Sequence, residues 1–207
     1  AYARAGEAEG MRVTIVTGDR DALQLASEQT RIAIPHKGYQ EPEYLDAKGV
    51  LAKYGVRPDQ VASYKGLTGD SSDNLPGVKG IGPKGASDLL QRFETLKGVY
   101  EHLDEIKPAM REKLERDREQ AFFCERMATL VCDFELPVTM HDLHLKDLDP
   151  APALTFFADL EFQTLGKRFQ GVVTSEYGKK HFLQSAIAEK KSSSAKSVDT
   201  KDQMALF

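Results

Sequence analysis

The sequence lacks tryptophan, contains only two cysteines and has no long hydrophobic run. Cys124 and Cys132 form no CxxC pair, so neither a zinc site nor a disulfide framework is indicated. No apolar stretch approaches the roughly 18 residues of a membrane-spanning helix, and no charged-then-apolar leader opens the chain. We therefore expect a cytoplasmic protein that has no membrane partner.

The 207-residue chain has the composition of a globular protein, with 41% hydrophobic and 29% charged residues. Its length allows one sizeable domain or two small ones. The net charge of −4 argues against a uniformly basic coat for nucleic acids but says nothing about local patches. Between Pro76 and Lys97, four basic residues outnumber two acidic ones, so this segment is a candidate phosphate-binding patch.

Two short β-branched segments predict a small parallel sheet. Residues 11–16 (MRVTIV) and 31–34 (RIAI) have the pattern of buried strands, and a helical turn over 22–27 separates them. This order is typical of a parallel α/β sheet. Two strands with one crossover cannot bury both of their faces, and the chain opens in the pattern of a helix that ends at Gly10. We therefore expect a fragment whose sheet is completed by upstream strands.

The following segment, up to Gly171, has mostly helical patterns. Helices are expected over 41–55, from Pro58 onward, over roughly 108–131 and, as a short pair, over 150–169. Beyond them, the composition is that of a linker. We predict three parts: the carboxyl part of an α/β core (1–56), a helical subdomain (57–171) and a flexible linker or tail (172–207).

Four aspartates have the pattern of a site for hard cations. Asp19 and Asp21 follow the first strand, at the sheet edge where α/β proteins bind ligands, and Asp70 and Asp73 share a face if their segment makes a helical turn. Two unit charges about 4 Å apart repel by about 4 kcal/mol at an effective dielectric near 20, so a convergent cluster needs cations. Oxygen ligands without histidine or cysteine favour Mg²⁺ or Mn²⁺, and a pair of such ions implies phosphodiester hydrolysis. The alternative is that these acids cap helices or are solvated.

The segment PGVKGIGPKGASDLL (76–90) is typical of a helix-hairpin-helix motif. Its glycines leave backbone N–H groups unobstructed, Val78 and Ile81 can pack beneath the turn, and a helix that begins near Pro83 directs its N–H groups to an anion. Such a motif binds the DNA backbone without reading bases; a plain interhelical turn is the alternative. The candidate DNA-binding residues are Gly77, Val78, Lys79, Gly80, Ile81, Gly82, Lys84 and Gly85.

Three segments carry a family resemblance: TGDRDALQL (17–25), KYGVRPDQVASYKGLTGDSSDNLPGVKGIGPKGASDLL (53–90) and DLEFQTLGKRF (159–169). Over roughly residues 1–170 the chain resembles the 5′-nuclease (5′-3′ exonuclease) domain of bacterial DNA polymerase I, in the flap endonuclease family. This resemblance implies an α/β fold with a truncated parallel sheet of the PIN or resolvase type, followed by a mostly helical helix-hairpin-helix subdomain. It also implies a magnesium-dependent hydrolase that removes primers or 5′ flaps in DNA replication and repair, close to the bacterial nucleoid.

The resemblance also implies roles for particular residues. The hairpin would bind duplex or flap DNA through backbone atoms and K⁺. Family members begin with an aspartate-bearing strand, a basic arch and an acidic helix motif, which this chain lacks, so we expect it to be inactive alone. Gly85 stands where threonine is usual, and Arg20 where lysine is common. The positions that belong mainly to the second half of a two-metal catalytic cluster are Asp19, Asp21, Asp70 and Asp73.

The last five residues, QMALF, resemble the pentapeptide by which bacterial replication proteins dock onto the sliding clamp. Gln203 would make a polar rim contact, and Leu206 and Phe207 would fill a hydrophobic pocket. An arbitrary apolar end of a linker is the alternative. The sequence thus leaves three hypotheses: a metal-dependent 5′ nuclease seen in part, a non-catalytic helix-hairpin-helix DNA-binding module, and a clamp-tethered adaptor.

Overall fold

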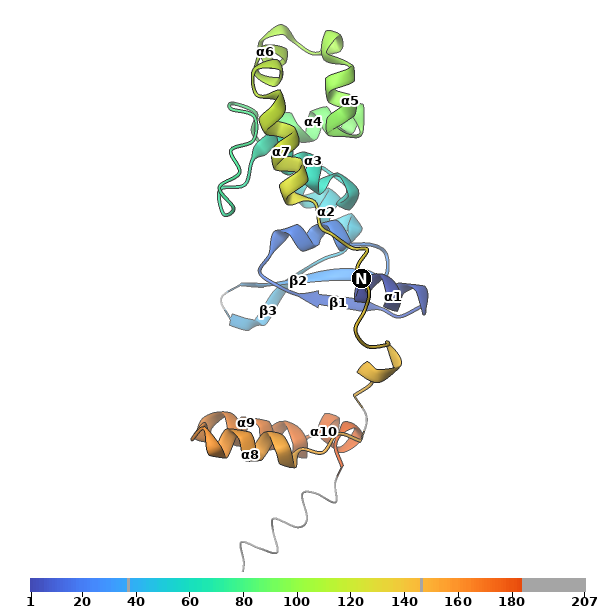
Figure 1. Cartoon of the computed structure of the whole chain (residues 1–207), viewed down its shortest axis with the longest axis vertical. Helices are drawn as coiled ribbons and strands as arrows, with labels where there is room; N and C mark the ends of the chain where they lie inside the picture. Colours follow the sequence, from blue (N-terminus) through green and yellow to red (C-terminus); the bar gives the residue numbers. More distant parts are fainter. Residues whose placement is uncertain (37, 146, 184–207) are drawn as a thin grey trace, which may run out of the picture. The chain divides into compact units, whose positions relative to one another are not determined.

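The computed structural model describes residues 1–36, 38–145 and 147–183. Contacts divide the chain into two compact units, Ala1–Met140 and a second that begins at His141. The first unit contains a small sheet and helices α1 to α7, and the second contains α8 to α10 (Figure 1). The predicted α/β fold with a helical subdomain is confirmed, while the predicted boundary at residue 56 stays a prediction.

The sheet has three strands in the order β1-β2-β3. After α1 (Tyr2–Ala8), β1 (Val13–Val16) pairs in parallel with β2 (Thr30–His36), and the 3-10 helix η1 (Arg20–Leu25) forms part of the crossover. The predicted pair of parallel strands is therefore confirmed. The carboxyl end of β1 leads directly into η1, so the first two aspartates lie at the predicted edge of the sheet.

Strand β3 (Gly38–Leu45) corrects the prediction of a helix over 41–55. It pairs antiparallel with β2, so the sheet is mixed rather than purely parallel. Pro42 lacks an N–H group and is tolerated because β3 is an edge strand. Pairing with β2 outweighs the local helical pattern of these residues, and helix α2 (Ala47–Tyr54) begins only after Asp46, whose side chain caps its first turn.

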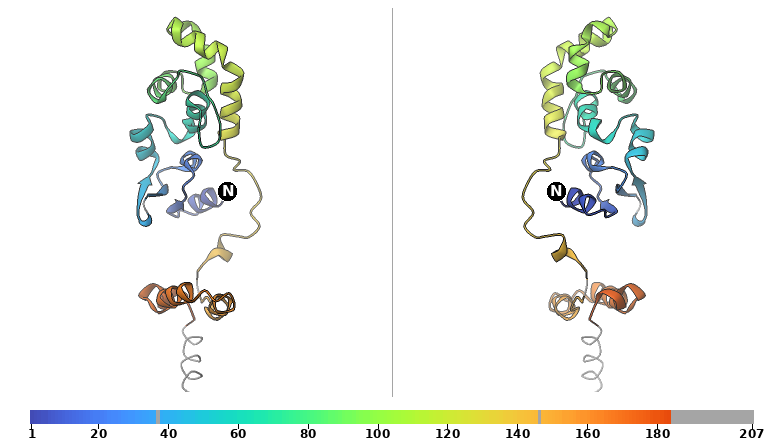
Figure 2. Two further views of the ribbon diagram at one scale, coloured as in Figure 1. Left: turned by 90° about the vertical axis from the view of Figure 1, so that its left-hand side faces the viewer. Right: turned by 90° about the vertical axis from the view of Figure 1, so that its right-hand side faces the viewer.

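Helix α3 (Val61–Thr68) is at the centre of the first unit. It packs against α4, α5, α7 and η1, and α7 lies beside it in Figures 1 and 2. Apolar side chains from these helices and from β2, such as the fully buried Leu67, Leu90 and Ile32, form one core. The bounds of the further elements are η2 (Pro58–Gln60), α4 (Pro83–Phe93), α5 (Leu96–Glu101), η3 (Leu103–Glu105), α6 (Pro108–Arg116) and α7 (Arg118–Ala128).

The single helix predicted over 108–131 is wrong, because the chain turns at Asp117 between α6 and α7. Two contacts fix the course of these helices: the Tyr100 hydroxyl donates to the Leu114 carbonyl (3.0 Å) near the end of α6, and the Gln24 side chain donates to the Ala128 carbonyl (2.7 Å) at the end of α7. Both contacts come from side chains outside α6 and α7, so local helical periodicity could not reveal the turn.

The second unit contains the 3-10 turn η4 (His141–Leu143) and three helices, α8 (Ala151–Asp159), α9 (Gln163–Thr174) and α10 (Glu176–His181). The predicted helix pair over 150–169 is confirmed, and Phe157 and Phe169 lie edge to face between its helices at a centroid distance of 5.8 Å. Helical structure thus extends past residue 171, where the sequence indicated the start of a tail.

No helix among the described residues is both long and apolar enough to cross a membrane. The predicted clamp-binding residues Gln203, Leu206 and Phe207 lie outside the described residues.

Candidate functional site

Two glycines hold together the ends of the segment GDSSDNLPG (69–77), which we call the acidic loop. Within the loop, the backbones of Asp70 and Leu75 exchange hydrogen bonds of 2.7 and 2.8 Å. Gly69 and Gly77 face each other across its neck with φ of +73° and +62°, and a side chain on either one would overlap the backbone opposite. The segment GDSSDNLPG (69–77) is therefore a closed loop, and its glycine neck places the acids directly beside the hairpin.

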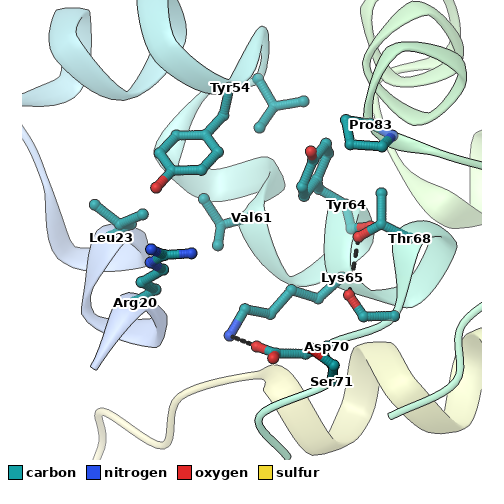
Figure 3. A pocket seen from close by; sticks show the side chains of 12 residues that line it. Arg20, Leu23, Tyr54, Val61, Tyr64, Lys65, Thr68, Asp70, Ser71 and Pro83 are labelled. Atoms are coloured by element: carbon teal, nitrogen blue, oxygen red, sulfur yellow. Dashed lines mark hydrogen bonds and ion pairs between the residues drawn. The ribbon is translucent and has the colours of Figure 1, made fainter. Parts of the chain in front are cut away.

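A lysine that the sequence analysis did not single out joins the two pairs of aspartates. Lys65, in the last turn of α3, is only 8% exposed. Its Nζ contacts Asp21 Oδ1 and lies 2.6 Å from Asp70 Oδ2 (Figure 3, which shows the contact with Asp70). One carboxylate from the sheet edge and one from the acidic loop thus meet at a single ammonium group.

This contact changes the titration of its members. Burial by itself would raise the pKa of Asp70, but hydrogen bonds from Lys65 and Ser72 outweigh it and lower the pKa to about 2. Burial would likewise lower the pKa of Lys65, but the hydrogen bonds to Asp21 and Asp70 raise it above its ordinary value. Lys65 and Asp70 therefore both carry their charge over the whole physiological range.

The other two predicted ligands are less closely tied. Asp19 is exposed and caps η1, since its Oδ1 accepts a hydrogen bond from the Asp21 N–H at 2.8 Å. This is the capping role that the sequence left open as an alternative. Asp73 is exposed on the tight turn 71–74, where its carboxylate has no hydrogen-bond or ion-pair partner among the described residues. The metal-binding role of all four aspartates stays a prediction.

A sequence signal could have identified Lys65. In α3 it follows Val61 by one turn, so it occupies a position on the buried face between core residues. A lysine at a core position needs a buried counter-charge. Asp70, in the nearby motif TGD (68–70), was available for that role, but only the fold shows that Asp21 also takes part.

The chemistry of the donors fits a hard divalent cation rather than zinc. Among the described residues no group of three or more His, Cys, Asp or Glu side chains forms a metal site. Two carboxylate oxygens do, however, converge on a point of positive charge at Lys65 Nζ. Oxygen donors without nitrogen or sulfur are typical of Mg²⁺ and Mn²⁺ sites.

A cavity of about 340 Å³ adjoins this cluster. Lys65 and Asp70 line one side of it, Arg20 lies at another, and the tyrosines Tyr54 and Tyr64 form an aromatic wall with ring centroids 6.4 Å apart (Figure 3). The wall continues to the first residue of α4. The cavity therefore connects the charged cluster with the hairpin.

The hairpin packs as the sequence predicted. Val78 and Ile81 are buried beneath the turn, and the Ile81 N–H donates to the Val78 carbonyl at 3.1 Å. Gly80, with φ of +86°, occupies the turn position that favours glycine. Lys79 and Lys84 are exposed. This arrangement leaves the two cationic side chains on the outer side of a rigid turn.

Backbone N–H groups of the hairpin divide into two sets. Those of Val78, Lys79 and Ile81 donate within the protein, to the Leu67 carbonyl, the Asp117 carboxylate and the Val78 carbonyl. A second set has no acceptor among the residues that the structure describes. It consists of the buried Gly77 and of four residues whose N–H groups are available to an anion: Gly80, Gly82, Lys84 and Gly85. The last three belong to the N-terminus of α4, whose dipole favours negative charge.

Comparison with known families identifies the helical region. Residues 56–151 match the family model described as "5'-3' exonuclease, C-terminal SAM fold". The matched region contains the acidic loop, the hairpin and helices α3 to α7.

Similar curated proteins include DNA polymerase I of Caldicellulosiruptor bescii, 41% identical over 161 residues, which covers 77% of this chain and 19% of that protein. DNA polymerase I of Bacillus subtilis is 37% identical over 167 residues, which covers 80% of this chain and 19% of that protein. Flap endonuclease Xni of Cronobacter sakazakii is 41% identical over 138 residues, which covers 67% of this chain and 53% of that protein. The chain thus spans about a fifth of the length of these polymerases and about half of that endonuclease.

Among solved structures, the T5 5′-exonuclease determined with bound zinc ions has a TM-score of 0.50 at 19% identity, and the alignment covers 61% of this chain and 47% of that one. This similarity confirms the fold.

Proposed function

From its membership of the 5′-3′ exonuclease family, in which bacterial DNA polymerase I and flap endonuclease Xni are its relatives, we propose that this chain is the metal- and DNA-binding part of a 5′ nuclease. The reaction is divalent-metal-dependent hydrolysis of DNA, as a 5′-3′ exonuclease or 5′-flap endonuclease that removes primers or flaps. The observation that carries the proposal is the convergence of Asp21 and Asp70 at one cation-binding point, directly beside the hairpin.

The metal would be held by aspartates at the cluster. Asp21 and Asp70 supply inward-facing oxygens. The exposed Asp73 and the second oxygen of Asp19, whose Oδ1 caps η1, would complete the ligands from this chain. Two carboxylates against one ammonium leave a net negative charge, which favours a divalent ion. Mg²⁺ or Mn²⁺ supplies an activated water and stabilises the leaving oxygen of a phosphodiester. Completion of a two-metal site requires further ligands, so we propose that this chain alone is inactive.

The hairpin would hold the DNA by its backbone. The N–H groups of Gly80, Gly82, Lys84 and Gly85 have no acceptor within the described part of the chain, and the side chains of Lys79 and Lys84 are exposed. Both kinds of donor are suited to phosphate oxygens. A monovalent cation such as K⁺ at the hairpin belongs to the same proposal. Because contacts of this type read no bases, the protein would recognise the structure of a duplex or flap rather than its sequence.

The decisive experiment combines D70N and D73N in the complete protein that contains this chain. We expect cleavage of a 5′-flap substrate to fall by at least about a hundredfold, because one side of the metal site is lost. The control is Asp104→Asn, which removes one negative charge from an exposed residue of η3, and it should cleave normally. Full activity of the double variant would refute the nuclease proposal.

A second candidate function, a non-catalytic DNA-binding module, is favoured by one observation. Lys65 already provides a counter-charge to Asp21 and Asp70, so these acids are stable without a metal. This function requires duplex binding whose log affinity falls by about 0.9 per phosphate contact for each tenfold rise in salt. It also requires that the complete protein shows no cleavage at any Mg²⁺ or Mn²⁺ concentration.

A further inference from the structure

The junction between α6 and α7 makes four side-chain hydrogen bonds to the hairpin backbone. Three hairpin carbonyls accept, and one hairpin N–H donates. The bonds run from Gln120 to the Gly77 carbonyl, from Arg116 to the Lys79 carbonyl (3.1 Å), from Lys113 to the Gly80 carbonyl (3.0 Å) and from the Lys79 N–H to Asp117 (2.8 Å). A segment more than 30 residues away in the sequence therefore sets the conformation of the turn.

Asp117 departs from the usual behaviour of its position. It is the N-cap residue of α7, where an aspartate normally accepts hydrogen bonds from its own helix, yet it makes no such bond. Its carboxylate instead accepts from Arg116 Nε (2.9 Å) and Nη2 (2.7 Å) and from the Lys79 N–H. Arg116, followed by the Lys79 N–H, lowers the pKa of Asp117 to about 2. The carboxylate is thus committed to the hairpin rather than to its helix.

The bond from Arg116 determines where the next N–H group points. In a trans peptide the C=O and N–H groups point in opposite directions. Arg116 binds the Lys79 carbonyl, so the N–H of the same peptide unit, which belongs to Gly80, is directed away from α6 and α7. That N–H is one of those without an acceptor among the described residues. A cation on the carbonyl also polarises the peptide and strengthens its N–H as a donor.

We propose that Asp117 and Arg116 are positioning residues for DNA binding, which fix the Lys79–Gly80 peptide so that the Gly80 N–H faces a backbone phosphate. This inference rests on the proposed function of the hairpin. Neither side chain needs to touch the DNA. Asp117 acts through the Lys79 N–H, and Arg116 acts through the Lys79 carbonyl and through Asp117.

The proposal predicts an effect opposite to simple electrostatics. Removal of a carboxylate makes the protein less negative, so Coulomb attraction alone predicts tighter binding of the DNA polyanion. If Asp117 positions the hairpin, its removal weakens binding instead. The sign of the change therefore separates a positioning role from a purely electrostatic one.

The experiment measures the affinity of the full 207-residue chain for a fluorescent 5′-flap duplex by anisotropy. We expect Asp117→Ala to weaken binding about five- to tenfold, which lies within the range of one ordinary hydrogen bond. Asp117→Asn, which retains an oxygen for the Lys79 N–H, should bind with an affinity between those of Asp117→Ala and the wild type. Glu115→Gln is the matched control. Within the described residues Glu115 pairs only with the exposed Arg111, so removal of its charge should leave affinity unchanged or slightly higher. Likewise, Arg116→Met should weaken binding more than Arg111→Met.

Amide hydrogen exchange measured without DNA gives a second readout. General destabilisation would accelerate exchange throughout the hairpin, whereas loss of the Asp117 contact should act on one N–H group. Exchange of the Lys79 N–H should accelerate in the Asp117→Ala chain, while exchange of the Val78 N–H, bonded to Leu67, should not change. If Asp117→Ala does not fold, the same two measurements are made on Asp117→Asn, which retains an oxygen for the Lys79 N–H.

The outcomes are distinct. Asp117 variants that bind DNA as tightly as Glu115→Gln overturn the inference but leave the DNA-binding proposal intact. A wild-type chain that binds no DNA overturns both.

Discussion

The acidic loop and the hairpin are neighbours across one glycine neck, but they satisfy their polar groups in opposite ways. In the acidic cluster the carboxylates of Asp21 and Asp70 face an internal cation, Lys65, which partly neutralises them. In the hairpin, side chains of α6 and α7 occupy the carbonyls, and several N–H groups are left open. The comparison indicates that the hairpin is prepared to accept an anion directly, whereas the cluster must exchange or rearrange its cation to accept a metal.

The strongest way to break both regions at once is a side chain at the neck. Gly77→Ala should destabilise the protein by about 3 kcal/mol or more, because a Cβ overlaps the backbone of Gly69 and the positive φ disfavours alanine. Urea unfolding measures the change. Gly171→Ala, in the open surface of α9, is the control and should be neutral or slightly stabilising. Equal stability of Gly77→Ala and wild type would show that the neck is not rigid.

Removal of the internal cation affects the cluster alone. Lys65→Met should cost about 3 kcal/mol of unfolding free energy near pH 7, because it leaves two largely buried carboxylates without their partner. If the carboxylates form a metal site, millimolar Mg²⁺ should restore more stability to this variant than to wild type, by binding only the folded state. Thermal unfolding with Mg²⁺ or EDTA tests this, and a variant that ignores Mg²⁺ would count against the metal site.

Acid should weaken the acidic cluster through protonation of Asp70. The folded-state pKa of Asp70 is lowered to about 2, so its stabilisation is complete above the unfolded pKa near 3.9 and is lost as the pH falls through about 2. The contribution is about 2 kcal/mol. Urea unfolding between pH 6 and pH 2 should show that the stability difference between wild type and Asp70→Asn shrinks over this window. A difference that stays constant with pH would contradict the role of ionised Asp70.

The smallest expected effect is that of a substitution at Gly85, in the first turn of α4. Gly85→Ala should stabilise the protein by up to about 1 kcal/mol, because glycine is a poor residue inside a helix. Its new Cβ would lie 3.4 Å from Met110 and 3.6 Å from Ile81, which are ordinary contacts. DNA affinity should be unchanged, since the N–H of residue 85 remains. Weaker binding with a stable fold would indicate that the space at residue 85, and not only its N–H, serves the ligand.

Much of the helical region could be predicted from sequence because its signals are local. Pro58 and Pro83 lie at the starts of η2 and α4, and the turn around Gly80 follows from backbone rules that need no distant partner. The parallel pair of β1 and β2 was also predictable from its β-branched segments. These features depend on propensities that a short stretch of chain carries by itself.

The errors occur where a distant contact overrides a local pattern. β3 has a helical texture but pairs with β2, and the helix expected over 108–131 turns at Asp117, whose side chain is bound to the hairpin. The role of Lys65 between the two aspartates could not be predicted for the same reason, because one of its two partners, Asp21, is 44 residues away in the sequence. Each depends on long-range pairing that periodicity does not encode.

Residue types alone indicate the chemistry of this chain: aspartates suited to a hard cation and a glycine-rich turn suited to phosphate. Their combination depends on the folded chain, which closes the loop at Gly69 and Gly77, places Lys65 between Asp21 and Asp70, and binds the hairpin to α6 and α7. The physical reason is that residue types set the charges and donors locally, whereas the cost of burying a charge and the direction of a peptide group depend on which distant side chains pack against them.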